Sequence, residues 1–303
     1  MQLKAISIGY AFPRSDFEAT IHSVFQSAAN FRLIHDNALL TVVASGEPDL
    51  PQGIRVDASS DFSFQALRAG EPVTCQENFL RFDAVTIALR EAKPWRCDLP
   101  SLKADMTDPA VTAAWKAAWQ VLNKQQFQSQ AEIIAEELFD FQGGAQNIVS
   151  RKVADAMHGL TDATRRLDLP ATTSIHPLIG LGSGLTPSGD DLLLGYLAGL
   201  WCGVWNKGER IQFLKDLGEV VIRLSHGTND ISRTYLHHAA RGQVSSRLAD
   251  LAGAICRGEN SDRLVFAVES ATRIGHTSGM DAVTGLLLGL GAWSPQLPNE
   301  RGV

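Results

Sequence analysis

One segment near the middle of the chain concentrates the side chains most able to do chemistry. Residues Gly180–Asp191 read Gly-Leu-Gly-Ser-Gly-Leu-Thr-Pro-Ser-Gly-Asp-Asp, and an apolar run with helical character, Leu192–Trp201, follows directly. A glycine-rich turn that leads into a helix leaves backbone N–H groups free at the positive end of the helix, where phosphate and carboxylate groups bind. The segment therefore predicts a site for a small anion.

A second copy of this pattern lies closer to the carboxyl end of the chain. In both copies a serine is followed by glycine and, three residues after the serine, by aspartate, which is the spacing of a helix capping box. Two glycines four residues apart follow in each copy and would let two helices approach closely. We therefore expect two helices side by side with their amino termini together, so that both positive ends face one ligand. The matching residues are Ser188, Gly189, Asp190, Asp191, Gly195 and Gly199, and Ser278, Gly279, Met280, Asp281, Gly285 and Gly289.

The adjacent carboxylates Asp190 and Asp191 exceed what a helix cap requires. Because neighbouring positions on a helix point in different directions, one carboxylate can cap while the other faces a ligand, a Mg²⁺ ion or a proton in transfer. A Mg²⁺ ion held by one or two carboxylates and phosphate oxygens is chemically sensible. A carboxylate that acts directly as a general base fits equally well.

Two further polar groups could complete an anion site. Arg233 falls in the first turn of a helix predicted to begin near Ile231, where a cation is unfavourable unless an anion lies nearby. Its guanidinium would bind carboxylate or phosphate as a fork, and His276 could transfer a proton or bind an anion. The predicted catalytic residues are Asp190, Asp191 and His276, and the predicted anion-binding residues are Gly182, Ser183, Gly184, Thr186, Ser188, Gly189, Asn229, Arg233, Ser278, Gly279 and Asp281.

A simpler interpretation competes with this one. Ser188 and Ser278 could merely cap two buried helices, the paired glycines could serve only helix packing, and Arg233 could be a solvated surface residue.

Composition limits the possible partners and the compartment. The chain has 303 residues, of which 45% are hydrophobic and 20% charged, a composition typical of a folded globular protein. A net charge of −6 gives no general attraction to nucleic acid. The longest apolar stretch, near Leu192–Val204, is too short to span a bilayer. Four widely spaced cysteines without a C-x-x-C motif, and an amino terminus unlike a signal peptide, predict a reducing, cytoplasmic location.

The first part of the chain has the pattern of a β domain. Short apolar or alternating runs separated by turn signals, such as Leu67–Pro72, are typical of strands in a small barrel or sandwich. The runs are Leu3–Tyr10, Ile21–Phe25, Phe31–Ile34, Leu39–Val43, Ile54–Val56 and Phe79–Phe82, with Val85–Arg90 as the last strand. A segment with three prolines, Pro94–Pro109, then marks a boundary, so we predict a β-rich domain at 1–98 and a second domain at 99–303.

The second domain has the periodicity of helices. Together with the Leu192–Trp201 run, the predicted helices are Ala110–Val121, Gln126–Phe139, Ile148–Leu167, Ile211–Ser225, Ile231–Ala240, Ser245–Arg257, Ser261–Ile274 and Met280–Leu290, with a helix stop at Gln142-Gly-Gly-Ala. The expected fold class is α+β, with an N-terminal β-rich, barrel-like domain followed by a mainly α-helical domain that carries the glycine-rich loop and its repeat.

Three groups of residues together resemble one known family. They are His22-Ser-Val-Phe25 with Asn30, Gly180–Asp191 with Gly195, and Gly275–Asp281 with Gly285. This combination resembles the family that contains the AllH subunit of oxamate carbamoyltransferase, and the matching blocks extend over most of the chain. Met280 departs from the pattern, because an aromatic residue is expected at that position.

The resemblance implies a subunit of a hetero-complex in late purine or allantoin nitrogen catabolism. There, oxalurate and phosphate give oxamate and carbamoyl phosphate, and oxalurate, phosphate and carbamoyl phosphate are all small anions. In such a reaction the Gly182–Gly184 and Ser188–Gly189 amides would hold phosphate or carboxylate, and Arg233 would clamp it. Asp190 or Asp191 would orient the attacked carbamoyl nitrogen or a metal ion.

Two other functions fit parts of the sequence. A non-catalytic scaffold or small-anion-binding subunit would dock through an apolar surface patch around Trp115 and Trp119, although residues four apart on a helix share one face and more simply predict core packing. A small-molecule kinase is the other alternative, because Pro177–Gly184 resembles the phosphate loop of the galactokinase and homoserine kinase superfamily. In this chain Thr186–Gly189 interrupts that loop before the helix.

Overall fold

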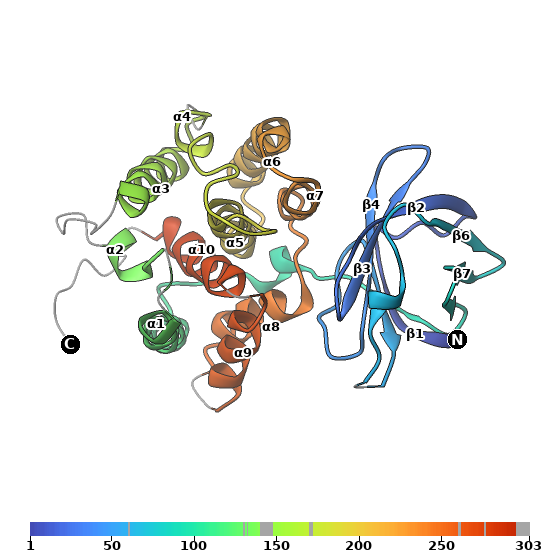
Figure 1. The fold of residues 1–303 in the computed structure, drawn as a ribbon. Helices are drawn as coiled ribbons and strands as arrows, with labels where there is room; N and C mark the ends of the chain where they lie inside the picture. The colour runs from blue at the N-terminus through green and yellow to red at the C-terminus, as the bar shows by residue number, and fades with distance from the viewer. Residues whose placement is uncertain are drawn as a thin grey trace. The chain divides into compact units, whose positions relative to one another are not determined.

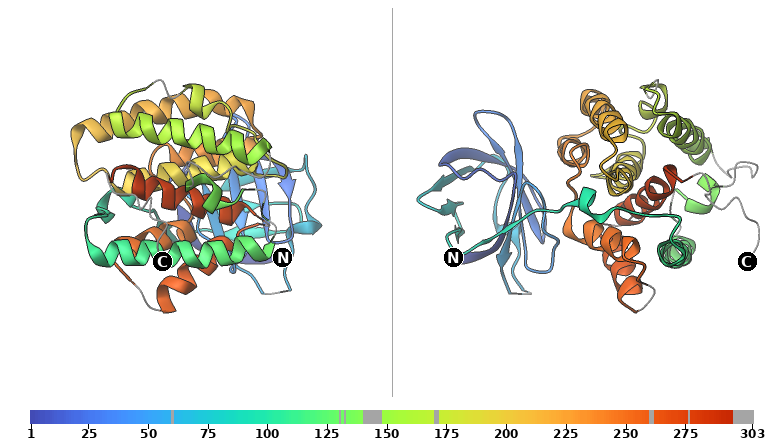
Figure 2. Two further views of the ribbon diagram at one scale, coloured as in Figure 1. Left: turned by 90° about the vertical axis from the view of Figure 1, so that its left-hand side faces the viewer. Right: turned by 180° about the vertical axis from the view of Figure 1, so that it is seen from behind.

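The computed structural model describes residues 1–59, 61–129, 131, 133–139, 148–169, 172–259, 262–275 and 277–294. The chain divides into two units, Met1–Cys97 and Asp98–Val303, drawn as ribbons in Figures 1 and 2. The first unit is a β barrel and the second consists mostly of helices. The predicted α+β class, with a barrel-like domain before a helical one, is confirmed.

The first unit is a barrel that closes through the pairing of β1 with β5. Eight strands form the ring in the order β5-β4-β3-β2-β6-β7-β8-β1, and β9 adds to β1. Both β8 and β9 run parallel to β1, β8 at its beginning and β9 at its end, so they share one edge of that strand. The strands are β1 Gln2–Gly9, β2 Phe17–Val24, β3 Ala28–Leu33, β4 Leu39–Val43, β5 Gly53–Asp57, β6 Pro72–Gln76, β7 Phe79–Arg81, β8 Thr86–Ala88 and β9 Lys93–Trp95.

Two predictions about these strands are wrong. Pro72 is not confined to a turn but begins strand β6, because proline is tolerated as the first residue of a strand. Val73 and Cys75 then alternate into the barrel core, a pattern too short to stand out in the sequence. Val85–Arg90 is also not the last strand, since β9 follows it and pairs with β1.

The barrel core is apolar, and a polar chain lies on the alternate residues of the same strands. Phe31 of β3 packs edge to face against Phe82, with ring centroids 5.8 Å apart. Its neighbour Asn30 is buried, donates to the Ser23 hydroxyl at 3.0 Å and accepts from the Thr41 hydroxyl at 2.8 Å. The motif residue Asn30 therefore ties β2, β3 and β4 together.

Replacing Asn30 with leucine should destabilise the barrel by about 1–3 kcal/mol, because the Thr41 hydroxyl would lose its buried acceptor. Urea unfolding followed by intrinsic fluorescence measures this. Adding Thr41→Val to the variant should cost less than Thr41→Val alone, since its partner is already gone. Equal costs in the two backgrounds would contradict this coupling.

The second unit is built from helices joined by short loops. Its elements are η2 Leu99–Leu102, α1 Pro109–Ser129, α2 Ala135–Phe139, α3 Ile148–Arg166, α4 Thr172–Ile175, α5 Ser188–Cys202, α6 Gly208–Leu224, η3 Ser225–Gly227, α7 Asp230–Ala239, α8 Ser246–Cys256, α9 Asp262–Thr272 and α10 Ser278–Ala292. No helix in the described part of the chain is long and apolar enough to cross a membrane. The helix stop predicted at Gln142-Gly-Gly-Ala lies outside the described residues.

The bounds predicted for the first two helices are wrong. Helix α1 continues unbroken to Ser129, and α2 begins only at Ala135. Gln126 explains the change of direction, because its amide donates to the Ile133 carbonyl at 3.1 Å and accepts from the Ala135 N–H at 2.9 Å. A side chain that satisfies the backbone between two helices is not visible in hydrophobic periodicity.

Helices α5 and α10 form the centre of this unit and lie side by side (Figure 1). A Cβ atom on Gly195 would lie 1.9 Å from the Ala282 carbonyl oxygen, and one on Gly285 would lie 1.9 Å from the Leu192 carbonyl oxygen. Only glycine permits so close an approach of two backbones. Gly199, four residues after Gly195, meets the Leu286 carbonyl, four residues after Ala282, so the two helices run parallel with their amino termini at the same end, as the repeat predicts.

Trp115 of α1 belongs to the core of this unit. Its ring is buried against α10, where its indole N–H donates to the Leu287 carbonyl at 2.9 Å. Trp119 stacks on it with ring centroids 5.5 Å apart. The core-packing interpretation is therefore confirmed for Trp115, and its ring is not part of a surface docking patch.

Candidate functional site

The loop before α5 folds back over the amino terminus of that helix. The Gly189 N–H donates to the Leu181 carbonyl at 2.8 Å. Gly182 has a φ of +109°, and a Cβ atom there would lie 2.8 Å from the Ser188 nitrogen. Glycine is therefore needed at this position for the loop to close. The Gly189 N–H is thus already hydrogen-bonded within the protein, whereas Gly182, Ser183 and Gly184 are exposed.

The predicted capping boxes are wrong for both copies of the repeat. Pro187 and Thr277 occupy the cap positions and make no side-chain cap hydrogen bond, while Ser188 and Ser278 are the first residues of their helices. Backbone oxygens satisfy the first turn of α5 instead. The N–H groups of Asp190 and Asp191 donate to the Pro187 carbonyl at 3.0 and 3.1 Å. The aspartates of the repeat are thus not needed as caps.

Asp190 is buried, and its carboxylate links helix α5 to two other segments. One carboxylate oxygen accepts from the Gly180 N–H at 2.9 Å, and the other accepts from the Thr228 hydroxyl just before α7. Burial raises the pKa of Asp190, and the hydrogen bonds from Thr228 and Gly180 oppose that rise. Because both oxygens already have protein partners, Asp190 holds the loop in place and is poorly suited to a ligand.

Asp191 is different, although it is the next residue. Only 6% of it is exposed, and its Oδ2 atom has no hydrogen-bond partner among the described residues. Burial raises the pKa of Asp191 well above its usual range, hydrogen bonds from Thr186 and Ser278 oppose the rise, and the Asp281 and Asp190 carboxylates add to it. This side chain combines burial, an open acceptor and a preference for the protonated acid.

The two helix ends meet at a pair of hydroxyl groups. The Thr186 and Ser278 side chains are hydrogen-bonded with 2.6 Å between their oxygens, which links the first loop to the first turn of α10. Asp281 in the same turn is 1% exposed. Gly279 lies against the carboxyl end of α9, where a Cβ atom would be 2.4 Å from the Ala271 carbonyl oxygen. The predicted convergence of the two amino termini is therefore present.

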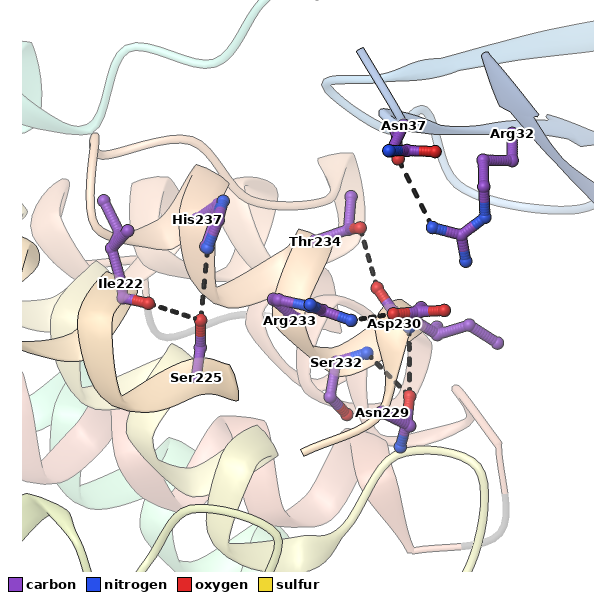
Figure 3. A network of polar contacts seen from close by, with 11 residues as sticks. Arg32, Asn37, Ile222, Ser225, Asn229, Asp230, Ser232, Arg233, Thr234 and His237 are labelled. Carbon is purple, nitrogen blue, oxygen red and sulfur yellow. Dashed lines mark hydrogen bonds and ion pairs between the residues drawn. The ribbon is translucent and has the colours of Figure 1, made fainter. Parts of the chain in front are cut away.

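Helix α7 joins the cluster through Asn229, whose contacts within the helix are drawn in Figure 3. Its side-chain oxygen accepts from the Ile231 and Ser232 N–H groups at 3.0 and 3.1 Å, the pattern of a helix cap. Its amide donates to the Leu185 carbonyl at 2.9 Å and so fixes the glycine loop. The Arg233 guanidinium pairs with Asp230, so an anion would compete with that carboxylate for it.

The structure gathers most of the predicted site residues at one place but gives them unequal roles. Thr186, Ser188, Gly189, Asp190, Asp191, Ser278, Gly279 and Asp281 lie at the joined helix ends. His276 lies outside the described residues. Sequence analysis missed Thr228 as a partner of Asp190, because a hydroxyl just before a helix predicts a cap rather than a contact with a distant carboxylate.

The predicted magnesium site does not fit the residues present. Both Asp190 oxygens are occupied by protein donors. In the described part of the chain no group of three or more histidine, cysteine, aspartate or glutamate side chains could hold a metal ion. The arrangement is better suited to hydrogen-bond donors than to a cation.

Thr228→Val should destabilise the helical unit by about 1–3 kcal/mol, since the buried Asp190 carboxylate loses a hydrogen-bond donor. Chemical denaturation measures the change. Thr234→Val is the matched control, because among the described residues that hydroxyl bonds only the Asp230 carbonyl of its own helix. Equal losses in the two variants would show that the Thr228–Asp190 hydrogen bond contributes no more to stability than a hydrogen bond within one helix.

Family comparisons match both parts of the chain. The family described as oxamate carbamoyltransferase subunit AllH matches residues 178–290, and the AllH family N-terminal domain matches residues 4–94. The first match includes the glycine loop, α5 and most of α10, so it contains both copies of the repeat. No solved structure matches the chain.

Proposed function

The chain belongs to the AllH family of oxamate carbamoyltransferase subunits, and from this premise we propose that it binds the anionic substrate of carbamoyl transfer. The binding site is the joined amino termini of α5 and α10 with the Gly180–Asp191 loop. The reaction is the conversion of oxalurate and phosphate to oxamate and carbamoyl phosphate, in purine or allantoin nitrogen catabolism in the cytoplasm.

The observation that carries this proposal is the buried Asp191 Oδ2 atom, which lacks a partner in the described structure. Buried polar atoms in folded proteins nearly always have a hydrogen-bond partner, and an exception suggests a role in binding or catalysis. A ureido group supplies suitable donors, because oxalurate carries an NH₂ and an NH beside its carbonyls. Asp191 would thus orient the carbamoyl end of the substrate.

The negative end of the substrate has a complementary environment. The amino termini of α5 and α10 both present the positive ends of helix dipoles. The exposed segment Gly182–Gly184 adds small residues through which an anion can approach the backbone. A carboxylate or phosphate bound there would lie near Asp191, which receives the nitrogen atoms. The site therefore recognises a small molecule with an anionic end and an amide end.

A binding subunit without chemistry of its own is the alternative that the family description also supports, since the family is that of a subunit. In that case the partner subunits carry out the transfer and this chain only holds a substrate. The two alternatives share the same site and differ in whether Asp191 takes part in turnover.

The test is reconstitution with the subunits encoded next to this chain. Phosphate-dependent release of oxamate from oxalurate, and carbamoyl phosphate formation, should occur only when the chain is present in the mixture. Isothermal titration calorimetry of the chain alone, with oxalurate and with inorganic phosphate, then tests whether this subunit itself binds either anion. Turnover without this chain, or no turnover in any mixture, would contradict the assignment of this reaction to the chain. Binding of oxalurate with turnover indifferent to Asp191 would favour the binding subunit.

A further inference from the structure

A cavity of about 270 Å³ lies at the carboxyl ends of α5 and α10. Its wall comes from residues in 104–107 before α1, in 203–207 between α5 and α6, and in 290–294 at the end of α10, together with Arg210 of α6. Both α5 and α10 have 15 residues, so about 20 Å of helix separates the cavity from their joined amino termini. The cavity is therefore distinct from the candidate site.

Trp293 is a fixed part of the cavity wall. Its ring packs edge to face against Phe213, with ring centroids 5.9 Å apart, and its indole N–H donates to the Leu200 carbonyl at 3.3 Å. A Cβ atom on Gly203 would lie 2.5 Å from Cδ1 of this ring, so the missing side chain makes room for it. The ring position is thus set by α5 and α6 before any ligand enters.

Arg210 lies over this ring as a cation without a carboxylate partner. Its guanidinium carbon is 4.6 Å from the Trp293 ring centroid, and one of its N–H groups donates to the Gly203 carbonyl at 2.7 Å. No carboxylate among the described residues forms an ion pair with it. Burial lowers the pKa of Arg210, and the nearby Glu209 carboxylate opposes this change without reversing it. A partly desolvated guanidinium with spare donors is suited to an anion.

The turn between α5 and α6 adds a second aromatic ring and a second cation. Trp205 and Asn206 have φ values of +51° and +56°, a conformation that is a genuine outlier for a side chain as bulky as tryptophan. Trp205 is 41% exposed, and its indole N–H donates to the Ala104 carbonyl at 2.6 Å. Lys207 follows at the cavity, and no ion pair of its ammonium occurs within the described structure. Strained backbone of this kind is often kept at binding sites.

The acid in the cavity wall does not neutralise these two cations. Asp105 accepts at one carboxylate oxygen from the Thr107 N–H and hydroxyl, at 2.9 and 2.6 Å. These hydrogen bonds lower the pKa of Asp105, so it stays ionised. The wall therefore has two cations, Arg210 and Lys207, and one carboxylate that is bound to its own loop.

From this arrangement we infer that the cavity binds a small anion that carries a planar ring. The ring lies against the indole rings of Trp205 and Trp293, and the anionic group is bound by Arg210 and Lys207. An aromatic carboxylate and a nucleoside monophosphate both have this chemistry. Such a ligand differs from the acyclic substrate of the proposed function, and the inference does not depend on that reaction.

The first test is titration of the full chain, followed by tryptophan fluorescence and calorimetry. The probes are adenosine monophosphate and 1-naphthoate, each beside its uncharged counterpart, adenosine or 1-naphthamide, and inorganic phosphate is the anion without a ring. At least one of the two ring-bearing anions should bind about tenfold more tightly than its uncharged counterpart and than phosphate. Which anion binds distinguishes a nucleotide from an aromatic carboxylate. Dissociation constants above about 1 mM for both anions would overturn the inference.

Substitutions then locate the bound anion. Arg210→Gln should raise its Kd by about tenfold, the usual effect of a lost hydrogen bond to a charged group. Lys207→Gln should raise it by about twofold to fivefold, because that side chain is exposed and screened by solvent. Arg223→Gln, at an exposed position on the same helix as Arg210, is the matched control and should leave the Kd unchanged.

Unfolding midpoints show whether each variant folds. Lys207→Gln keeps the test decisive if Arg210→Gln does not, since the exposed Lys207 side chain is not part of the core. A Kd that is the same in the wild type and in every folded variant of this pair would place the anion elsewhere and overturn the assignment of the cavity.

Discussion

Replacing Asp191 with asparagine is expected to lower the kcat of the assembled complex by about 10²–10⁴-fold, the usual contribution of a positioned acid or base. Asparagine preserves the shape of the side chain, and its amide oxygen still accepts a hydrogen bond. It cannot take up or release a proton as an acid or base in the transfer. Steady-state kinetics with oxalurate and phosphate should show the loss mainly in kcat.

The neighbouring residue provides the sharpest contrast with this variant. Asp190→Asn can still accept from the Gly180 N–H, but the Thr228 hydroxyl must then turn to accept from the new NH₂ group and loses its charged acceptor, so the variant should lose about 1 kcal/mol of stability. Asp155→Asn, at an exposed position on α3, should change neither stability nor kcat. Wild-type kcat in Asp191→Asn would show that this chain binds substrate without taking part in the transfer.

The second large effect is expected from Gly195→Ala, which should destabilise the helical unit by about 3 kcal/mol or more. The new methyl group would lie 1.9 Å from the Ala282 carbonyl oxygen, and both atoms belong to rigid helices. The helices must therefore move apart, and other contacts along their interface are lost. Because a domain is stable by only about 5–15 kcal/mol, this is a large fraction.

Thermal and urea unfolding of the variant measure this loss, and the second copy supplies an internal check. Gly285→Ala should cost a similar amount, because its Cβ atom would lie equally close to the Leu192 carbonyl oxygen. The double variant should lose less than the sum, since either methyl group alone already separates the helices. Gly208→Ala in α6 is the control, as nothing lies within 4 Å of its Cβ position. If the Gly195→Ala variant unfolded at the midpoint of the wild type, the close packing of α5 against α10 would be refuted.

Hydrophobic periodicity was sufficient for the general architecture. The alternation along β1 and the helical period of Leu192–Trp201 depend on local spacing, which the sequence carries directly. The start of β6 at Pro72 depends on its partner β2, and the break after α1 depends on a hydrogen bond between Gln126 and Ala135. Such features arise from contacts outside the local pattern and have no signature in periodicity.

The candidate site, too, could be predicted from the sequence only where it depends on local spacing. The repeat correctly predicted that the two helix ends meet, because its glycines recur with the same spacing in both copies. It did not distinguish Asp190 from Asp191. That difference arises only when Gly180 and Thr228 close on Asp190 and leave an Asp191 oxygen without a described partner. Identical side chains acquire different roles through the loop that folds over them.

The repeat that begins α5 and α10 differs between its two copies at one informative position. Asp190 fastens the glycine loop on the α5 side, whereas its counterpart Met280 is an apolar residue whose sulfur accepts from the Ser129 hydroxyl at 3.4 Å. A perfectly symmetrical site could not tell one end of a molecule from the other. The α5 end carries a carboxylate at this position and the α10 end carries a thioether, so the two ends of the site differ chemically. A substrate with unlike ends can therefore bind in a single orientation.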